Sequence, residues 1–152
     1  GCDLQNDTVL KLSEIPNIIG VKDATGDMTR GIDLIKRLPS HFSVLSGDDA
    51  TALSFMLLGG KGVISVTANV APKLMHEMWA CVMSKQNEKA IEINRQLFSL
   101  HTNLFIESNP IPVKWALKIM GLIKEGIRLP LVELNQEHHK IIQTAMKEAH
   151  IQ

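Results

Sequence analysis

The sequence predicts an α/β fold in which short parallel strands alternate with helices. Three short apolar runs, residues 18–22, 42–46 and 63–66, are rich in β-branched side chains, and each precedes a segment with helical spacing. Such runs are typical of strands that are buried in a parallel sheet. Their alternation with helices implies parallel strands that are joined by right-handed crossovers.

Caps and prolines set the expected helix boundaries. Asp7 and Asp27 are the expected N-caps of the first two helices, Pro39 ends the second, and Pro72 fits the first turn of a later one. The expected helices are residues 8–15, 28–38, a segment ending at Leu58, 72–84, 88–105, 111–120 and 133–149.

No strand is predicted beyond residue 86. The sequence therefore predicts an α/β part, residues 1–86, and an α-helical domain, residues 87–152. Three parallel strands cannot close a barrel, and alone they leave two unpaired sheet edges. Because the chain begins with Gly1 rather than Met, we expect the rest of the sheet to lie on a segment that is missing here.

Composition and charge exclude several classes of protein. The 16 basic and 16 acidic side chains balance, which provides no basic surface for a nucleic-acid partner. No apolar run approaches the roughly 20 residues that span a bilayer, and no secretion signal is present. Cys2 and Cys81 are far apart, so we expect free thiols in a reducing, cytoplasmic location.

Lys22 is the strongest candidate catalytic residue. It ends the first predicted strand, in the run Gly20-Val21-Lys22-Asp23. In an α/β barrel the carboxyl ends of the strands carry the catalytic groups. A nucleophilic lysine must lose its proton, and burial in an apolar barrel mouth favours the neutral amine. The alternative is a solvated lysine just beyond a strand.

Polar residues also follow the second and third strands. Asp48 and Asp49 suit helix N-capping, while Gly47 would allow a ligand to approach the backbone closely. Thr67 and Asn69 could bind carboxylate oxygens or cap a helix.

Two other patterns do not support a cofactor. The glycine-rich run 59–62 lacks the order of a phosphate-binding loop and precedes a strand instead of following one, so we interpret it as a turn. The six histidines show no metal-ligand spacing, and we expect them on the surface. We therefore expect neither a metal nor a cofactor.

Four runs together resemble a known family. They are Asn17–Gly26 (NIIGVKDATG), Leu45–Ala50 (LSGDDA), Gly62–Asn69 (GVISVTAN) and Asn109–Trp115 (NPIPVKW). In this order they resemble the dihydrodipicolinate synthase family, which belongs to the pyruvate-dependent class I aldolases. The resemblance covers the whole chain and implies the last three βα units of a (β/α)8 TIM barrel, followed by a C-terminal helical domain.

The resemblance also implies a set of site residues. Lys22 would condense with pyruvate as a Schiff base, Ile64 would contribute backbone contacts to the bound pyruvate, and Gly47 and Asp48 would line the site. The implied enzyme is a lyase that joins pyruvate to aspartate semialdehyde in lysine and diaminopimelate biosynthesis. Family members are usually homotetramers.

Several family residues are absent from this chain. The threonines that bind the pyruvate carboxylate, the catalytic tyrosine and the arginine for the second substrate lie upstream in the family, and this sequence contains no tyrosine. We therefore expect the chain alone to be nearly inactive without its N-terminal half-barrel. Family members more often have Glu where Asp23 stands.

Two alternatives remain open from the sequence. The first is a sister aldolase such as N-acetylneuraminate lyase, which shares the lysine and the barrel. The second is a non-catalytic, truncated fragment that serves only in packing or interaction, in which Lys22 would tolerate replacement.

Overall fold

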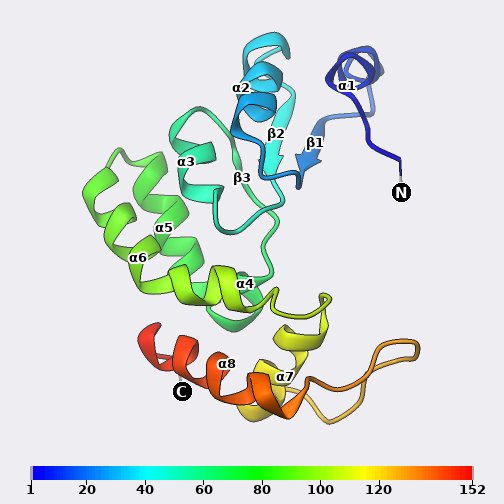
Figure 1. Ribbon diagram of the computed structural model, residues 1–152. Coiled ribbons are helices and arrows are strands. Elements are labelled where there is room, and N and C mark those ends of the chain that lie inside the picture. The colour runs from blue at the N-terminus through cyan, green and yellow to red at the C-terminus, as the bar shows by residue number, and fades with distance from the viewer. Residues whose placement is uncertain (1, 152) are drawn as a thin grey trace. The chain divides into compact units, whose positions relative to one another are not determined.

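A computed structural model describes residues 2–151 of the chain. The chain divides into two compact units, residues 1–65 and residues 66–152, and each is described here by itself (Figure 1). This division falls earlier than the domain boundary that the sequence predicts near residue 86, because the helix beginning at Pro72 packs with the later helices. The domain boundary of a longer fold remains a prediction.

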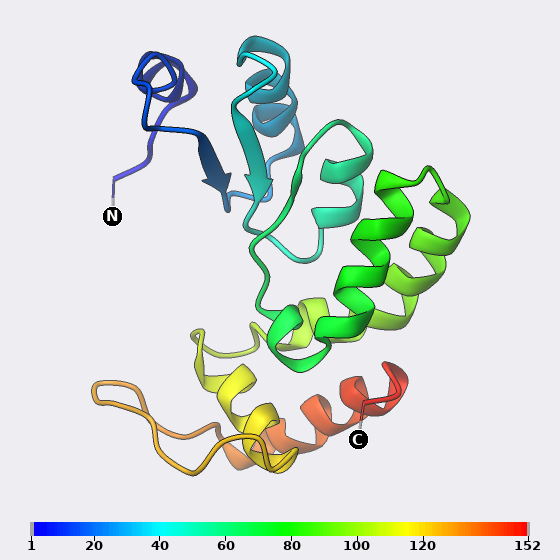
Figure 2. The same ribbon diagram turned by 180° about the vertical axis from the view of Figure 1, so that it is seen from behind.

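The first unit is a three-stranded sheet with helices between the strands. Its strands are parallel and lie in the order β1-β2-β3, and Figure 2 shows the arrows of β1 and β2 pointing the same way. The elements are α1 (Asn6–Leu12), β1 (Gly20–Asp23), α2 (Met28–Arg37), β2 (Ser43–Ser46), α3 (Ala52–Leu57) and β3 (Gly62–Val63).

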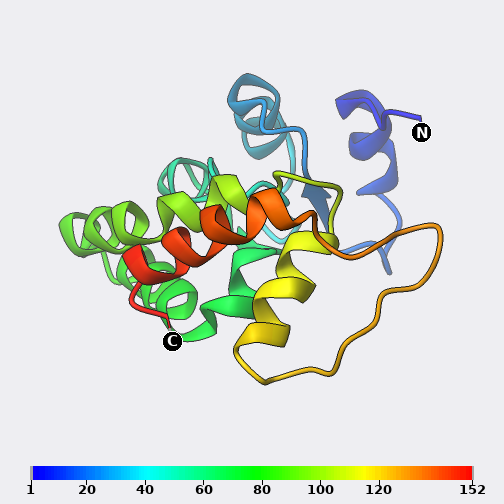
Figure 3. The same cartoon turned by 60° about the horizontal axis from the view of Figure 1, so that its bottom comes forward.

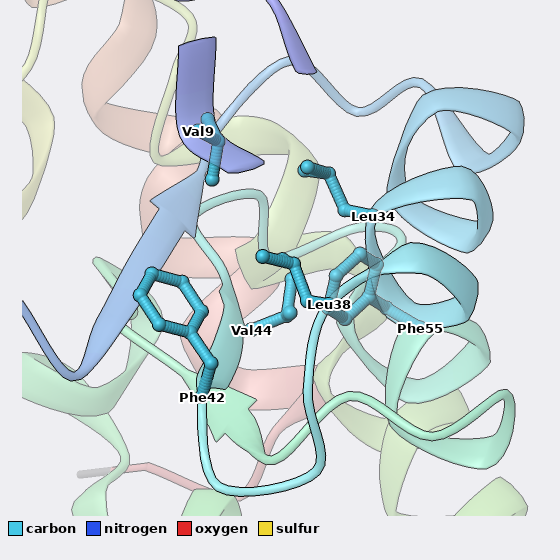
Figure 4. Packing of buried hydrophobic residues seen from close by; sticks show 6 residues of the cluster. All are labelled: Val9, Leu34, Leu38, Phe42, Val44 and Phe55. Carbon is cyan, nitrogen blue, oxygen red and sulfur yellow. The ribbon is translucent and has the colours of Figure 1, made fainter. Parts of the chain in front are cut away.

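The helices of this unit pack on one face of the sheet. Six buried residues form the core of that face (Figure 4): Val9, Leu34, Leu38, Phe42, Val44 and Phe55. Val21 of β1 packs against this cluster from the neighbouring strand. Because side chains alternate along a strand, Lys22 and its register partner Leu45 lie on the opposite face.

The ring of Phe55 packs between two glycines. A Cβ on Gly31 of α2 would lie 2.4 Å from the Phe55 Cε2 atom, and a Cβ on Gly60 would lie 2.2 Å from its Cδ1 atom. Real Cβ contacts essentially never fall below 3.0 Å. Both positions therefore have to remain without a side chain if the ring is to keep its place in the core.

The second unit is helical. Figure 3 shows α8 lying beside α6, in agreement with their contacts, and a long segment joining α7 to α8. Glu107 joins the turn after α6 to the start of α8: its Oε1 atom accepts from the Asn135 amide at 2.9 Å and lies 2.8 Å from His138 Nδ1. The elements are α4 (Thr67–Val70), α5 (Pro72–Met83), α6 (Asn87–Asn103), α7 (Ile111–Ile119) and α8 (Gln136–Glu148).

Most of the predicted elements are present, with shifted ends. Asp27 caps α2 as predicted, because its carboxylate accepts from the Arg30 amide. The N-cap of α1 is Gln5, so the prediction for Asp7 was wrong. The third strand is shorter and begins earlier than predicted, and α4, which begins at Thr67, is a short helix that the sequence does not predict.

Two further expectations can be compared with the structure. Cys2 and Cys81 are both free thiols, as expected. Within residues 2–151, no helix is long and apolar enough to cross a membrane.

We predict that Gly31→Ala destabilises the chain. Alanine in a helix is favoured over glycine by about 1 kcal/mol, but overpacking a core costs about 1–3 kcal/mol. Because the new Cβ would meet a ring packed from both sides, we expect a net loss of about 1 kcal/mol in urea unfolding. The control is Thr29→Ala on the exposed side of α2, which should not destabilise the chain. Equal or greater stability of Gly31→Ala would contradict this packing.

We also predict a pH dependence that comes from Glu107. The Asn135 amide, and next the His138 ring, hold the pKa of the Glu107 carboxyl below its ordinary value of 4.5. A lowered pKa contributes stability that is present above pH 4.5 and is lost as the pH falls through the lowered value. Wild type should therefore melt at a higher temperature than Glu107→Gln at pH 6, and the gap should narrow towards pH 3.

The matched control for this prediction is Glu92→Gln on the exposed side of α6. Its difference in Tm from wild type should stay constant over the same pH range. A gap between wild type and Glu107→Gln that does not change with pH would show that the carboxyl contributes nothing through its ionisation.

Candidate active site

Lys22 lies near the carboxyl end of β1, on the sheet face opposite the helices of its own unit. Its side chain is exposed. The expectation that an apolar wall buries this lysine is therefore wrong for the chain as it stands. The flanking apolar residues do not surround the amine, because Val21 points to the other face and packs into the helix-side core.

Gly47 contacts the Lys22 side chain directly. A Cβ on Gly47 would lie 2.5 Å from Lys22 Cε and 2.7 Å from the Cβ atom of Ala24. The Gly47 amide donates to the Asp23 carbonyl oxygen at 2.7 Å, which extends the β1–β2 ladder by one bond. The absence of a side chain at Gly47 thus allows the end of the lysine chain to lie against the β2–α3 turn.

Hydrogen bonds within the turn that carries Gly47 stabilise it. The buried Ser46 hydroxyl accepts from the Asp48 amide at 3.2 Å and donates to the Asp48 carbonyl at 3.0 Å. The Asp48 carboxylate accepts from both the amide and the hydroxyl of Thr51, at 2.9 and 2.7 Å. Asp48 therefore caps the turn that leads into α3, through one of its two carboxylate oxygens. The N-cap of α3 itself is Thr51, so the prediction that Asp48 or Asp49 caps this helix was wrong.

The Asp48 carboxylate also faces the loop after β1. A Cβ on Gly26, a residue with φ of +69°, would lie 3.6 Å from the Asp48 carboxyl carbon. The structure thus brings the β1–α2 and β2–α3 loops together, with Lys22 against Gly47 and Gly26 against Asp48.

Ile64 follows β3 and is half exposed. Its amide donates to the Ser46 carbonyl oxygen at 2.8 Å, so the carbonyl oxygen is the backbone group left to meet a ligand. Leu45 pairs with Gly62 in the register, which places Ile64 level with Gly47, two residues further along each strand. Alternation puts both on the Lys22 face of the sheet.

The four predicted site residues do not share one enclosed cavity. A hollow of about 300 Å³ runs along the outer edge of β1 and is lined by Lys22, Asp23 and Arg30 among others, but not by Gly47, Asp48 or Ile64. Within the first unit the predicted site is therefore an open sheet face rather than a closed pocket.

Asp23 is a residue that the sequence reasoning passed over. Its side chain is buried, and its Oδ1 atom accepts from the Thr25 amide and hydroxyl at 3.0 and 2.7 Å. Arg30 Nε lies 3.6 Å from its other oxygen. Strand alternation could have indicated this, because a residue next to an open-face lysine must point into the helix-covered face.

The other polar candidates are placed differently. Thr67 and Asn69 lie inside α4, so neither caps its start, and Asn69 donates to the Val66 carbonyl oxygen. His101 is buried, with Nδ1 2.9 Å from the Thr67 hydroxyl, which corrects the expectation that all six histidines lie on the surface. Over residues 2–151, no group of three histidine, cysteine or acidic side chains is placed to hold a metal ion.

The arrangement offers a primary amine beside a backbone turn, without a bulky neighbour. An amine at the carboxyl end of parallel strands can attack a carbonyl carbon, and the adjacent backbone groups can orient that carbonyl compound. Such a site is suited to forming an imine with a small carbonyl compound.

The chain is similar to several known enzymes. The chain is 58% identical to the 4-hydroxy-tetrahydrodipicolinate synthase of Nitrosomonas eutropha, over 98% of this chain and 51% of that protein. It is 59% identical to the enzyme of the same name from Nitrosospira multiformis, over 98% of this chain and 50% of that protein. The chain spans about half the length of the curated relatives that it matches.

Solved structures of dihydrodipicolinate synthases are also similar to this chain. The dihydrodipicolinate synthase of Acinetobacter baumannii, described as complexed with pyruvate, superposes with a TM-score of 0.95 at 53% identity, over 99% of this chain and 52% of that one. A relative described as a monomeric variant has a TM-score of 0.94 at 36% identity, over 100% and 52%. The profile of the Dihydrodipicolinate synthetase family matches residues 1–149. This chain therefore belongs to the dihydrodipicolinate synthetase family.

Proposed function

We propose that this chain is the lysine-bearing half of a 4-hydroxy-tetrahydrodipicolinate synthase, a lyase of lysine and diaminopimelate biosynthesis. In this role Lys22 forms an imine with pyruvate, and the enamine derived from it condenses with aspartate semialdehyde. The relatives of this name and the pyruvate complex of the Acinetobacter baumannii enzyme support the choice of substrates.

The contact between Lys22 Cε and Gly47 is the observation that carries the proposal. It holds the lysine chain at the carboxyl end of the sheet, on the face that the helices of its unit leave uncovered. Ile64 is level with Gly47 in the strand register, which supports a role for its backbone beside the bound pyruvate. An amine beside backbone groups at strand ends is what a pyruvate-binding site needs.

The first half of the reaction forms the enamine. The neutral Lys22 amine attacks the ketone carbon of pyruvate, and loss of water gives an iminium. The iminium withdraws electrons from the neighbouring methyl group, so a proton leaves that carbon and an enamine forms. The Ile64 carbonyl oxygen and the backbone at Gly47 would orient the pyruvate in this step.

The second half makes the new ring. The enamine carbon attacks the aldehyde of aspartate semialdehyde, whose oxygen becomes a hydroxyl group. The amino group of the same substrate then attacks the imine carbon, which closes the ring and releases Lys22. These proton transfers need a positioned acid–base group. Since the chain contains no tyrosine, we propose that the group belongs to the missing half.

We also propose that β1, β2 and β3 are the last three strands of a (β/α)8 barrel. Three observations support this: the strands are parallel and in sequence order, the helices of the unit pack on one face only, and Ile19 beside β1 is 73% exposed. The other half would cover the Lys22 face and supply the apolar surroundings that this chain lacks. A homotetramer stays a prediction, because one solved relative is described as monomeric.

The direct test is borohydride reduction with pyruvate, followed by peptide mass mapping. We expect an adduct on Lys22, formed slowly by this chain alone and at least about tenfold faster with the N-terminal half of the Nitrosomonas eutropha relative added. Lys22→Ala should abolish the adduct, whereas Lys36→Ala on α2 should leave it unchanged.

Three results would contradict the proposal, one from this trapping experiment and two from turnover assays with aspartate semialdehyde and with sialic acid. No adduct on Lys22, even with the N-terminal half present, would favour a non-catalytic fragment. Turnover at a normal rate by this chain alone would refute the need for the missing half. Cleavage of sialic acid, without condensation with aspartate semialdehyde, would identify a sister aldolase.

We predict that Gly47→Ala slows adduct formation without unfolding the chain. Its Cβ would meet Lys22 Cε at 2.5 Å and Ala24 Cβ at 2.7 Å, so both the lysine chain and the loop at Ala24 must shift. A displacement of this size should lower the trapping rate by about tenfold to a hundredfold. The control is Ser43→Ala, on the same face of β2, which adds no atom and should trap pyruvate at the wild-type rate. Equal trapping rates for Gly47→Ala and Ser43→Ala would contradict the prediction.

A further inference from the structure

We infer that Asp23 is a positioning residue for the Lys22 amine, acting through the backbone of Gly47 without touching the substrate. The inference rests on the proposed imine role of Lys22. Asp23 follows Lys22 in β1, and alternation places its carboxylate on the helix-covered face, away from the amine. Its effect on the lysine has to be transmitted through the strand and the neighbouring turn.

The carboxylate of Asp23 closes a ring of interactions around the loop between β1 and α2, here called the β1–α2 ring (Asp23, Thr25, Asp27 and Arg30). The Thr25 hydroxyl donates to Asp23 at 2.7 Å and accepts from the Asp27 amide at 3.2 Å. The Asp27 carboxylate accepts from the Arg30 amide at 3.1 Å, and Arg30 Nε faces Asp23 Oδ2 at 3.6 Å. These contacts form a closed chain that begins and ends at the Asp23 carboxylate.

Charge, rather than a hydrogen bond, links Asp23 to Arg30, because neither Asp23 Oδ2 nor Arg30 Nε has a hydrogen-bond partner in the structure. The Asp23 side chain is only 4% exposed, and a buried carboxylate is tolerated only when it is paired and hydrogen-bonded. Arg30 supplies the opposite charge, and it is fixed in turn by two bonds to Asp3, at 2.8 and 2.9 Å. Hydrogen bonding to Asp3 is the main reason that the pKa of Arg30 is raised, so the guanidinium remains charged.

The ring is coupled to the lysine through one backbone bond. The carbonyl oxygen of Asp23 accepts the Gly47 amide at 2.7 Å, and Gly47 is the residue whose Cα lies against Lys22 Cε. We expect the hydrogen bonds to the Asp23 side chain to limit rotation of the backbone that carries its carbonyl group. The ring thereby determines where Gly47, and with it the lysine chain, is held.

Asp23→Asn keeps the shape of the side chain and removes its charge. The amide would still offer an oxygen to Thr25, but it would turn an NH2 group toward Arg30, which is itself a donor. The ring should open at that link. Asp23→Glu keeps the charge, and the gap of 3.6 Å to Arg30 Nε, wider than a hydrogen bond, leaves room for it to close the ring again.

The experiment measures two quantities on the full chain, in variants that fold by circular dichroism. The first is the rate of borohydride-trapped pyruvate adduct on Lys22, and the second is amide hydrogen exchange at Gly47. Asp23→Asn should lower the trapping rate about tenfold and speed Gly47 exchange by a similar factor, and Asp23→Glu should recover both to within about threefold of wild type. Exchange at Ile64, whose amide bonds to Ser46 on the other side of β2, should change by less than about twofold.

A matched control separates positioning from general stability. Asp33→Asn removes a different carboxylate, which lies on α2, pairs with Arg37 and accepts from Asn6 outside the ring. It should leave the trapping rate and Gly47 exchange within about twofold of wild type. If Asp23→Asn does not fold, Thr25→Val serves as the test variant, because it removes the hydroxyl that links Asp23 to Asp27. It should lower the trapping rate and speed Gly47 exchange by about threefold each.

The outcomes distinguish this inference from the proposed function. Unchanged Gly47 exchange in folded Asp23→Asn, or in Thr25→Val, overturns the positioning role whatever the lysine does. A wild-type chain that traps no pyruvate overturns the imine proposal, while exchange at Gly47 still decides whether Asp23 holds that turn.

Discussion

The ladder between β1 and β2 is the constraint on which the rest of the site depends. It pairs Lys22 with Leu45 and continues past the strand ends through the bond from Gly47 to Asp23. Because side chains alternate along each strand, this one register sends the core residues to the helices and the lysine to the open face. A slip of one residue would bury the lysine in the core and expose Val21.

Much of the fold could be predicted from the sequence because its signals are local. The β-branched runs and the Asp27 cap indicated two strands and α2 within a few residues. The extent of β3 and the existence of α4 could not be predicted this way. Strand pairing ends after Val63, and a helix of four residues is too short to show a period.

The site could be predicted only in part, for a related reason. The position of Lys22 at a strand end followed from the apolar run before it, but its exposure depends on what covers the sheet, which these 152 residues do not supply. The contact with Gly47 and the burial of Asp23 join segments about 25 and 7 residues apart in the chain. Strand alternation indicates the face on which Asp23 lies, but a pattern along the sequence carries no information on its partners there or on the contact between Lys22 and Gly47.

Phe55 packs between two parts of the fold that lie far apart in the sequence. Its ring fills the space left by Gly31 on α2 and by Gly60 ahead of β3, so the helix after the first strand and the entry to the third are spaced by one side chain. A smaller residue at position 55 would make room for a methyl group at either glycine. Among relatives, the three positions should therefore vary together, with small residues at 31 and 60 accompanying a large ring at 55.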